Sequence, residues 1–124
     1  MNALAWILSG LLAVVFVGAG AAKLFTPRKK LLENPRMAWT NDFSETQIKA
    51  IAGLEVLAGV GLILPWLLDI ARVLTPLAAV GLAILMIGAL VTHGRRGELK
   101  QALPVNGVLV AIAVIVAVLR FSQL

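Results

Sequence analysis

Residues 73–92 read VLTPLAAVGLAILMIGALVT, a run of 20 residues without a charged side chain. A transmembrane α-helix needs about 20 mostly apolar residues to cross a hydrocarbon core that is about 30 Å thick. This segment therefore predicts a helix that spans a membrane. Two more segments meet the same requirement, at about residues 3–25, where the first charge is Lys23, and at about residues 101–119, which carry no charge.

A fourth helix is predicted at about residues 45–66, and its start can be located from its capping residues. Ser44 is followed three residues later by Gln47, which is the pattern of a capping box at a helix N-terminus. Pro65 suits the other end of this helix, since proline interrupts a helix interior. The segment differs from the other three because its apolar stretch contains an acidic residue, Glu55.

The composition indicates a membrane protein rather than a soluble one. Of the 124 residues, 60% are apolar and 14% are charged, whereas soluble domains contain about 25% charged residues. The length suits a single domain. No cysteine is present, which excludes a disulfide scaffold, a zinc–thiolate site and thiol redox catalysis.

The net charge of +5 is concentrated in the connections between helices. Basic residues in short connections mark the cytoplasmic side, so the two basic connections are predicted to be cytoplasmic and both termini external. Only Arg72 and Arg120 lie on the opposite side, together with Trp6 and Trp66, which fit an aromatic belt. Nucleic-acid binding is not expected, because aromatic and basic residues do not interleave along one face. The basic residues of the connections are Arg28, Lys29, Lys30, Arg36 and Lys49, and Arg95, Arg96 and Lys100.

The predicted fold is thus an all-α, four-helix transmembrane bundle with both termini outside and two basic cytoplasmic loops. The longer loop covers residues 26–43, and one membrane domain covers residues 1–124. The first apolar segment is longer than the roughly 7 to 15 residues of a signal-peptide core, and no basic residue precedes it. A membrane helix is therefore favoured over a cleaved signal.

Glu55 lies about ten residues into its helix, which at about 1.5 Å per residue places it near mid-membrane. An ionised carboxylate there costs about 2.5–3.5 kcal/mol even on a lenient scale, so it is expected to face protein and to have a partner. Side chains lean toward the N-terminus of their helix, so antiparallel neighbours lean toward each other. Lys23 and His93 are therefore predicted to converge on Glu55, and Asn106 lies at a comparable depth.

Each of these residues also has a simpler interpretation. Lys23 can extend its ammonium to the membrane interface, and His93 beside Gly94 fits a loop position. Asn106 can serve in helix packing alone, and Glu55 can belong to a purely structural ion pair. A single histidine does not form a metal site by itself, so no metal is expected.

Small residues four positions apart indicate where helices pack closely in a membrane. One such pair, Gly18 and Ala22, lies in the first predicted helix. Gly59, one turn after Glu55, leaves room for a neighbouring helix, a water or a ligand. Further pairs are Ala79 and Ala83, Gly107 and Ala111, and Ala113 and Ala117.

Five short motifs occur in order along the chain: GAAKL at 20–24, GLEVL at 53–57, GLILP at 61–65, LTPLAA at 74–79 and HGRRGE at 93–98. In order and spacing they resemble the DoxX-like family of small bacterial membrane proteins. This resemblance covers most of the chain and implies a four-helix protein of the bacterial inner membrane. Lys23, Glu55 and His93 match polar positions of the family pattern, whereas Asn106 is not part of it.

About function the resemblance implies less: some similar proteins are linked to membrane redox systems, such as quinone-coupled sulfur oxidation or oxidant defence, and many have no assigned activity. We expect an accessory or anchoring subunit of a redox-linked complex, with a quinone-like or lipid ligand near Glu55. With one histidine and no cysteine, the chain cannot supply bis-histidine haem ligation or an iron–sulfur cluster, so no intrinsic cofactor is expected. The expected partners are membrane lipid, a redox protein and further copies of the chain.

Two other functional classes remain open from the residues. A small proton-coupled transporter would use Glu55 as its membrane acid, although small multidrug transporters of similar length carry that acid in the first helix. A membrane enzyme acting on a lipophilic substrate would use Glu55 as general acid or base, with Lys23 or His93 tuning it. No nucleophile motif, phosphate loop or metal set completes a catalytic site.

Overall fold

A computed structural model describes residues 2–27, 29–30, 33 and 43–124 of the chain. Within these residues the elements are four α-helices, and each is long and apolar enough to cross a membrane. The prediction of an all-α, four-helix membrane protein is therefore confirmed. Most of the predicted loop at residues 26–43 lies outside the described residues, including Arg28 and Arg36. The helices are α1 (Asn2–Phe25), α3 (Glu45–Leu67), α4 (Leu74–Arg95) and α5 (Leu99–Ser122).

The last two helices extend beyond the apolar runs that predicted them. Helix α4 continues to Arg95, so His93 lies inside the helix rather than after it, and α5 begins at Leu99 and ends at Ser122. The turn between them is a Schellman motif, with Gly97 at a φ of 73°, a conformation that suits glycine. Polar residues at helix ends reach water, so the helical backbone does not stop where the apolar run stops.

The predicted start of α3 is confirmed in detail. The backbone N–H of Gln47 donates to Ser44 Oγ at 3.1 Å, and the backbone N–H of Ser44 donates to Gln47 Oε1 at 2.9 Å. The two side chains satisfy two donors that an uncapped helix would leave without partners. This capping box fixes where α3 begins and so fixes the position of Glu55 along it.

Pro65 lies inside the last turn of α3, and its missing N–H is compensated from the next helix. Without that N–H, the carbonyl of Gly61 lacks its helical donor. The Thr75 hydroxyl, fully buried at the start of α4, donates to this carbonyl at 2.9 Å. A gap in the hydrogen bonding of one helix is thus filled by a side chain that ties α3 to α4.

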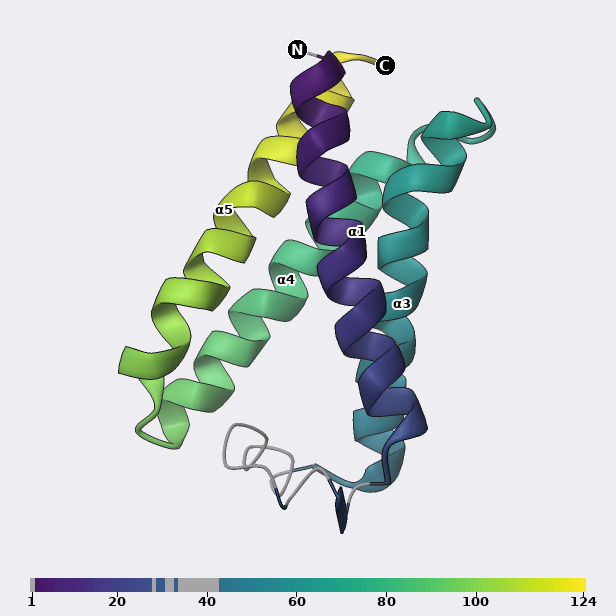
Figure 1. Ribbon diagram of the computed structural model, residues 1–124. Helices are drawn as coiled ribbons and strands as arrows, with labels where there is room; N and C mark the ends of the chain where they lie inside the picture. Colours follow the sequence, from purple (N-terminus) through teal and green to yellow (C-terminus); the bar gives the residue numbers. More distant parts are fainter. Residues whose placement is uncertain (1, 28, 31–32, 34–42) are drawn as a thin grey trace.

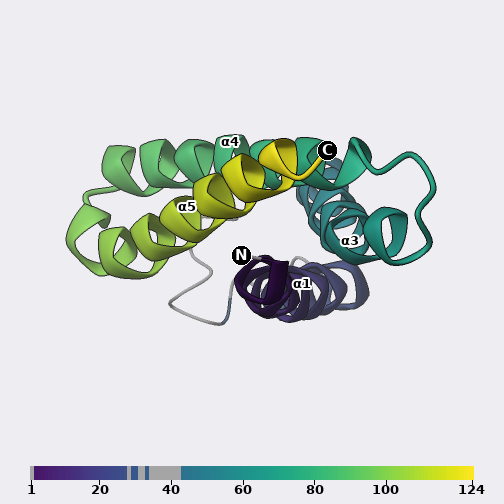
Figure 2. The ribbon, with the colours of Figure 1, turned by 90° about the horizontal axis from the view of Figure 1, so that it is seen from above.

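The four helices form two antiparallel pairs. Helix α1 packs most extensively on α3, and α4 on α5, and the view from above shows the two pairs side by side (Figure 2). Both chain termini and the α3–α4 turn lie at one end of the bundle (Figure 1). We call this end of the bundle the terminal half. The half that holds the end of α1, the start of α3 and the α4–α5 turn is the loop half.

The buried apolar core lies in the terminal half and at the middle of the bundle. Two of the predicted small-residue pairs are buried there, on α4 and α5, whereas Gly18 faces open space. Outside the core, many large apolar side chains are exposed, as in Val14 and Leu57, which is the surface expected against lipid chains. The core consists of Leu12, Phe16, Leu62, Ala79, Leu82, Ala83, Met86, Ala113, Val116 and Ala117.

The terminal half is closed by a stack of arginine and tryptophan side chains. The Arg120 guanidinium is fully buried and lies 4.9 Å from the ring centre of Trp6 and 4.3 Å from that of Trp66. Arg72 lies 4.0 Å from the same Trp66 ring. These four residues, which we call the Arg–Trp stack, join α1, α3, the α3–α4 turn and α5 through cation–π contacts.

Two amide oxygens accept hydrogen bonds from one nitrogen of Arg120, whereas its buried Nε and Nη2 face the rings without a hydrogen-bond partner among the described residues. Its Nη1 donates to Asn2 Oδ1 at 2.9 Å and to Gln123 Oε1 at 2.8 Å. Among the described residues no carboxylate pairs with this guanidinium. Trp6 and Trp66, predicted to form an aromatic belt, thus pack with Arg72 and Arg120 in one cluster, which the sequence alone does not reveal.

At the other end of the bundle, Lys49 joins the start of α3 to the end of α1. Its ammonium donates to the carbonyl oxygens of Lys23, Leu24 and Thr26 at 2.7, 2.8 and 2.8 Å. The last carbonyls of a helix have no helical partners and carry the negative end of the helix dipole, so a cation is stabilising there. Lys49 therefore holds the end of α1 against α3.

Candidate functional site

A cavity of about 830 Å³ lies between the two helix pairs, and along α4 its lining extends from His93 in the loop half to Ala78 in the terminal half. Its walls are mostly apolar and come from residues 15–23 of α1, 51–58 of α3 and 78–93 of α4, with two residues of α5 and Phe43. We call this cavity the cleft. Its polar lining residues are Lys23, Glu55, Thr92, His93 and Asn106. All four residues singled out in the sequence therefore border one space.

Glu55 and Lys23 form an ion pair at the wall between α1 and α3. The Lys23 ammonium donates to Glu55 Oε1, and the two side chains are 11% and 2% exposed, lysine first. Lys23 thus turns inward instead of extending to the interface. Because the pair has no net charge, it can stay buried at a lower cost than either ion alone.

Two glycines let α1 and α3 approach closely enough for this pair to form. A Cβ added at Gly20 would lie 2.7 Å from the Ala52 carbonyl oxygen, and one at Gly59 would lie 2.7 Å from Val17 Cγ2. Gly20 lies one turn before Lys23, and Gly59 lies one turn after Glu55. The space predicted beside Gly59 is therefore occupied by the neighbouring helix.

His93 approaches the cleft from the opposite wall, at the end of α4. Its Nδ1 lies 3.1 Å from Glu98 Oε1, and Arg96 Nε lies 3.3 Å from the same oxygen. The Schellman motif brings Glu98 back over the helix end, since its N–H donates to the His93 carbonyl at 2.8 Å. The backbone turn thus places a carboxylate beside the imidazole.

The remaining polar groups of the cleft are neutral. Asn106 borders it from α5. Thr92 also borders it, and its hydroxyl donates to the Gly88 carbonyl of its own helix at 3.1 Å. The α4–α5 wall therefore presents an imidazole and an amide, facing the ion pair of the α1–α3 wall.

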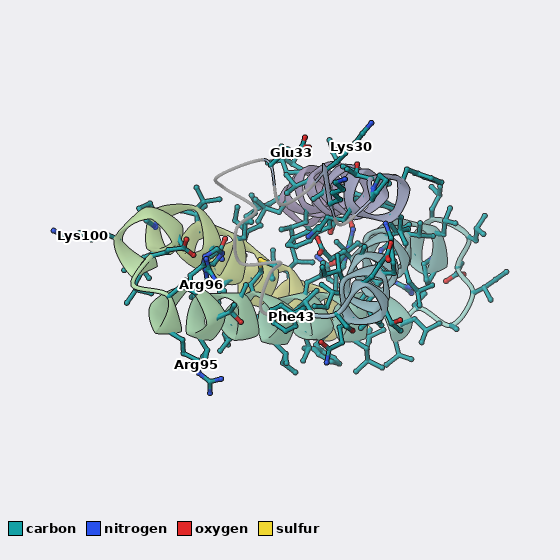
Figure 3. All side chains as sticks on the ribbon, turned by 90° about the horizontal axis from the view of Figure 1, so that it is seen from below. Lys30, Glu33, Phe43, Arg95, Arg96 and Lys100 are labelled. Carbon is teal, nitrogen blue, oxygen red and sulfur yellow. The ribbon has the colours of Figure 1, made fainter. Side chains whose placement is uncertain are left out.

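The cleft is open to the outer surface of the bundle. Three apolar residues that line it are also exposed at that surface, namely Val15 at 43%, Leu54 at 56% and Ile84 at 65%. Seen from the loop end, Arg95 and Lys100 point away from the bundle, whereas Arg96 lies on the inner side of the turn (Figure 3). A molecule dissolved in the lipid thus meets an apolar route toward Glu55.

The comparisons with known proteins give one match, and it extends over all four helices. The profile of the DoxX-like family matches residues 7–116. The chain belongs to the DoxX-like family. No curated protein and no solved structure matches it. The matched range contains every residue that lines the cleft of this DoxX-like protein, which is a multi-pass membrane protein.

Glu98 and Phe43 are the site residues of this DoxX-like protein that the sequence analysis did not single out. Glu98 ends the HGRRGE motif, and Gly97 before it is the usual sign of a chain reversal after a helix. A reversal at that glycine directs the next residue back toward His93. The sequence therefore contained a signal that places Glu98 beside His93. Phe43 directly precedes the capping residue Ser44 of α3, and no sequence signal places it at a cleft.

The arrangement offers hydrogen-bond donors and acceptors inside an apolar cleft. An ammonium, a carboxylate, an imidazole and an amide border it, and such a mixture fits the polar end of a lipid-soluble molecule. In the part of the chain that the structure describes, no three His, Cys, Asp or Glu residues are grouped closely enough to hold a metal ion. The site thus suits the binding of an amphiphile.

Proposed function

We propose that this membrane protein binds a lipid-soluble amphiphile, a quinone-like molecule or a lipid, in the cleft. In this proposal it serves as an accessory or anchoring subunit of a redox-linked complex in the bacterial inner membrane. The observation that carries the proposal is the cleft itself, which leads from the exposed residues Val15, Leu54 and Ile84 to the buried ion pair.

The size and lining of the cleft support an amphiphile as its ligand. Its volume of about 830 Å³ falls within the range of about 300–1,000 Å³ that is usual for small-molecule sites. An apolar tail fits the walls formed by residues such as Ala58, Leu85 and Leu109. A polar head group fits beside Lys23 and Glu55.

The chemistry of the ion pair also supports a polar head group at that position. Lys23 donates to Glu55 Oε1, so Glu55 Oε2 serves as an acceptor for a hydroxyl or amine of the ligand. Hydrogen bonds to charged groups contribute about 1.5–3 kcal/mol. A head group that can both donate and accept is therefore favoured over a plain hydrocarbon.

The accessory role rests on the family and on the residues available for electron transfer. Some similar proteins are linked to redox systems, and one histidine with no cysteine leaves haem or iron–sulfur ligation to another chain. In this proposal a partner supplies the redox centre, while the DoxX-like subunit holds the lipid-soluble ligand. The partner is a redox protein, and further copies of the chain contribute to the assembly.

Native mass spectrometry with decylubiquinone as probe tests the binding. Leu85→Trp fills the cleft without touching the ion pair, and we expect it to abolish probe binding. Leu77→Trp is the matched control, because Leu77 lies on the same helix but is 49% exposed and does not line the cleft. Glu55→Gln is expected to weaken binding about tenfold or more, because it replaces a charged acceptor.

The outcomes separate the two parts of the proposal. Equal binding to the parent, Leu85→Trp and Leu77→Trp would show that the cleft is not the binding site. Copurification from native membranes with a flavin, haem or iron–sulfur protein supports the accessory role. Purification without any such protein, from cells grown under several respiratory conditions, contradicts it.

A further inference from the structure

Two arginines from distant parts of the chain stack on one ring in the terminal half. Arg120 of α5 lies 4.3 Å from the centre of the Trp66 ring, and Arg72 of the α3–α4 turn lies 4.0 Å from it. The two guanidinium carbons are therefore no farther apart than the sum of these distances. Like charges this close repel each other, more strongly beside a buried group than in water. An anion bound next to them would offset the repulsion.

The charge of Arg120 has no counter-ion in the part of the chain that the structure describes. Its side chain is fully buried, and the two amide oxygens that accept from its Nη1 are neutral. The faces of the tryptophan rings stabilise a cation in part, but a buried charge without an ion of opposite sign is costly. The terminal half thus carries a positive charge that a nearby anion would stabilise.

Arg72 is the member of the Arg–Trp stack that an anion can reach, since its side chain is 38% exposed. Its Nε lies 3.5 Å from Asp69 Oδ1, which is longer than the roughly 2.7–2.9 Å of a charge-assisted hydrogen bond. The side chain of Asp69 is itself 79% exposed, and ion pairs in such surroundings are weak. A stronger acceptor can therefore replace Asp69 at Arg72 without unpacking the bundle.

The backbone that leads into Arg72 is strained. Asp69 and Ala71 have φ values of 55° and 47°, in the left-handed region that is unfavourable for residues with a Cβ. Strained residues of this kind cluster at sites that hold a ligand. The turn keeps Arg72 over the Trp66 ring at a cost in stability, which a simple connection between two helices does not require.

The surroundings of Arg72 fit a lipid better than a free ion. The turn joins two membrane-spanning helices (Figure 1), so it lies at the depth of the lipid head groups. Leu67, Leu68 and Ile70, which precede Arg72 along the chain, are 61, 58 and 66% exposed. These apolar side chains suit contact with acyl chains, while the planar guanidinium suits a phosphate, to which arginine can donate two parallel hydrogen bonds.

We propose that the Arg–Trp stack binds the phosphate head group of an anionic phospholipid. Arg72 donates directly to the phosphate, and the buried charge of Arg120 strengthens the attraction from beneath. None of the four residues of the stack lines the cleft. The site is therefore separate from the one in the proposed function, and the inference does not depend on ligand binding in the cleft.

Native mass spectrometry tests this site, with phosphatidylglycerol as the anionic probe and phosphatidylcholine as the zwitterionic comparison. We expect the parent chain to prefer phosphatidylglycerol. Arg72→Gln should weaken phosphatidylglycerol binding about tenfold, because a charge-assisted contact is lost. Arg95→Gln is the matched control, since it changes the net charge equally and Arg95 points away from the bundle at the other end (Figure 3).

Asp69→Asn distinguishes lipid binding from a purely structural role of the stack. It removes the carboxylate that competes for Arg72, and asparagine adopts the left-handed backbone as readily as aspartate does. Phosphatidylglycerol binding should therefore rise about threefold, the size of a surface ion pair. Leu85→Trp, which fills the cleft, should bind phosphatidylglycerol as the parent chain does.

Four results would overturn the inference. The first is equal binding of the two lipids by the parent chain, and the second is an equal loss in Arg72→Gln and Arg95→Gln. The third is loss of phosphatidylglycerol binding in Leu85→Trp, which would place the lipid in the cleft. The fourth is displacement of the lipid by an equal concentration of inorganic phosphate, which would indicate a site for a free anion. Failure of decylubiquinone to bind in the cleft would contradict the proposed function alone.

Discussion

The two halves of the bundle bury charge in different ways. In the terminal half, Arg120 is fully buried among tryptophan rings and amide oxygens. In the loop half, Glu55 is 2% exposed and paired with Lys23, beside a cavity of about 830 Å³. A buried charge alone does not mark a ligand site. The cavity next to the ion pair distinguishes the candidate site from the Arg–Trp stack.

The same contrast appears in how helices are joined. The terminal half is tied across its helix pairs, by the Arg–Trp stack and by Thr75 of α4 on Gly61 of α3. In the described part of the loop half, the polar contacts stay within pairs, as in Lys23 with Glu55 and His93 with Glu98. Among the described residues, the polar ties between the two pairs thus lie in the terminal half, and four substitutions test this contrast.

The largest effect is expected from Lys23→Met, which leaves the Glu55 carboxylate buried without its partner. Breaking a buried ion pair in this way costs about 3–5 kcal/mol, measured as the free energy of unfolding in detergent micelles. The double variant Lys23→Met with Glu55→Leu should recover most of this loss, since no lone charge remains. Equal losses in the single and double variants would mean that the pair is not buried as described.

The second largest loss of stability is expected from Gly20→Ala, with Gly18→Ala as its matched control. The new Cβ at position 20 would lie 2.7 Å from the Ala52 carbonyl, whereas position 18 has no atom within 4 Å. Overpacking at position 20 should cost up to about 3 kcal/mol, and Gly18→Ala should be neutral or stabilising, because alanine favours helix. Thermal unfolding compares them, and equal melting temperatures would refute the close approach of α1 and α3.

A smaller loss is expected from Thr75→Val in the terminal half. The Gly61 carbonyl would then lack both its helical donor and the Thr75 hydroxyl, at a cost of about 1–2 kcal/mol. Thr92→Val is the control, since its hydroxyl bonds to a carbonyl of its own helix. Hydrogen exchange at the end of α3 should rise in the first variant alone, and a similar rise in both would argue against a tie between α3 and α4.

The smallest effect is expected from Ala71→Gly, and it is a gain in the free energy of unfolding. Ala71 has a φ of 47° in the α3–α4 turn, a left-handed conformation that costs residues with a Cβ about 1–2 kcal/mol. Ala71→Gly removes this cost but loses chain entropy on folding, so a net gain of about 0.5 kcal/mol is expected. Calorimetry in micelles measures it, and a loss of stability would show that this turn is not strained.

Much of the fold was predictable because a membrane helix leaves a strong local signal. Uncharged apolar runs located three of the helices, and the Ser44 capping box fixed the start of α3, whose apolar stretch contains Glu55. The ends of α4 and α5 were placed too early because hydropathy reports where the lipid ends, whereas backbone hydrogen bonding continues through Arg95 and Ser122. The orientation of the bundle in the membrane stays a prediction.

Contacts between helices were harder to predict, because they depend on how each helix is rotated about its own axis and not on the order of the helices along the chain. Small-residue spacing suggested Gly18, but the close contact is at Gly20, since two residues along a helix turn the chain to another face. The sequence predicted that Glu55 lies in the membrane and that Lys23 is a partner, but it did not indicate the size of the cleft. The function of these site residues stays a prediction as well.

Lys49 has a consequence for protein engineering. By holding the end of α1 against the start of α3, it keeps the two ends of the long connection close together whatever lies between them. The entropy of closing a loop grows slowly with its length, by about 0.6 kcal/mol for each doubling. An affinity tag or a fluorescent domain inserted between residues 30 and 43 should therefore be tolerated, and it would report on the bundle without altering either terminus.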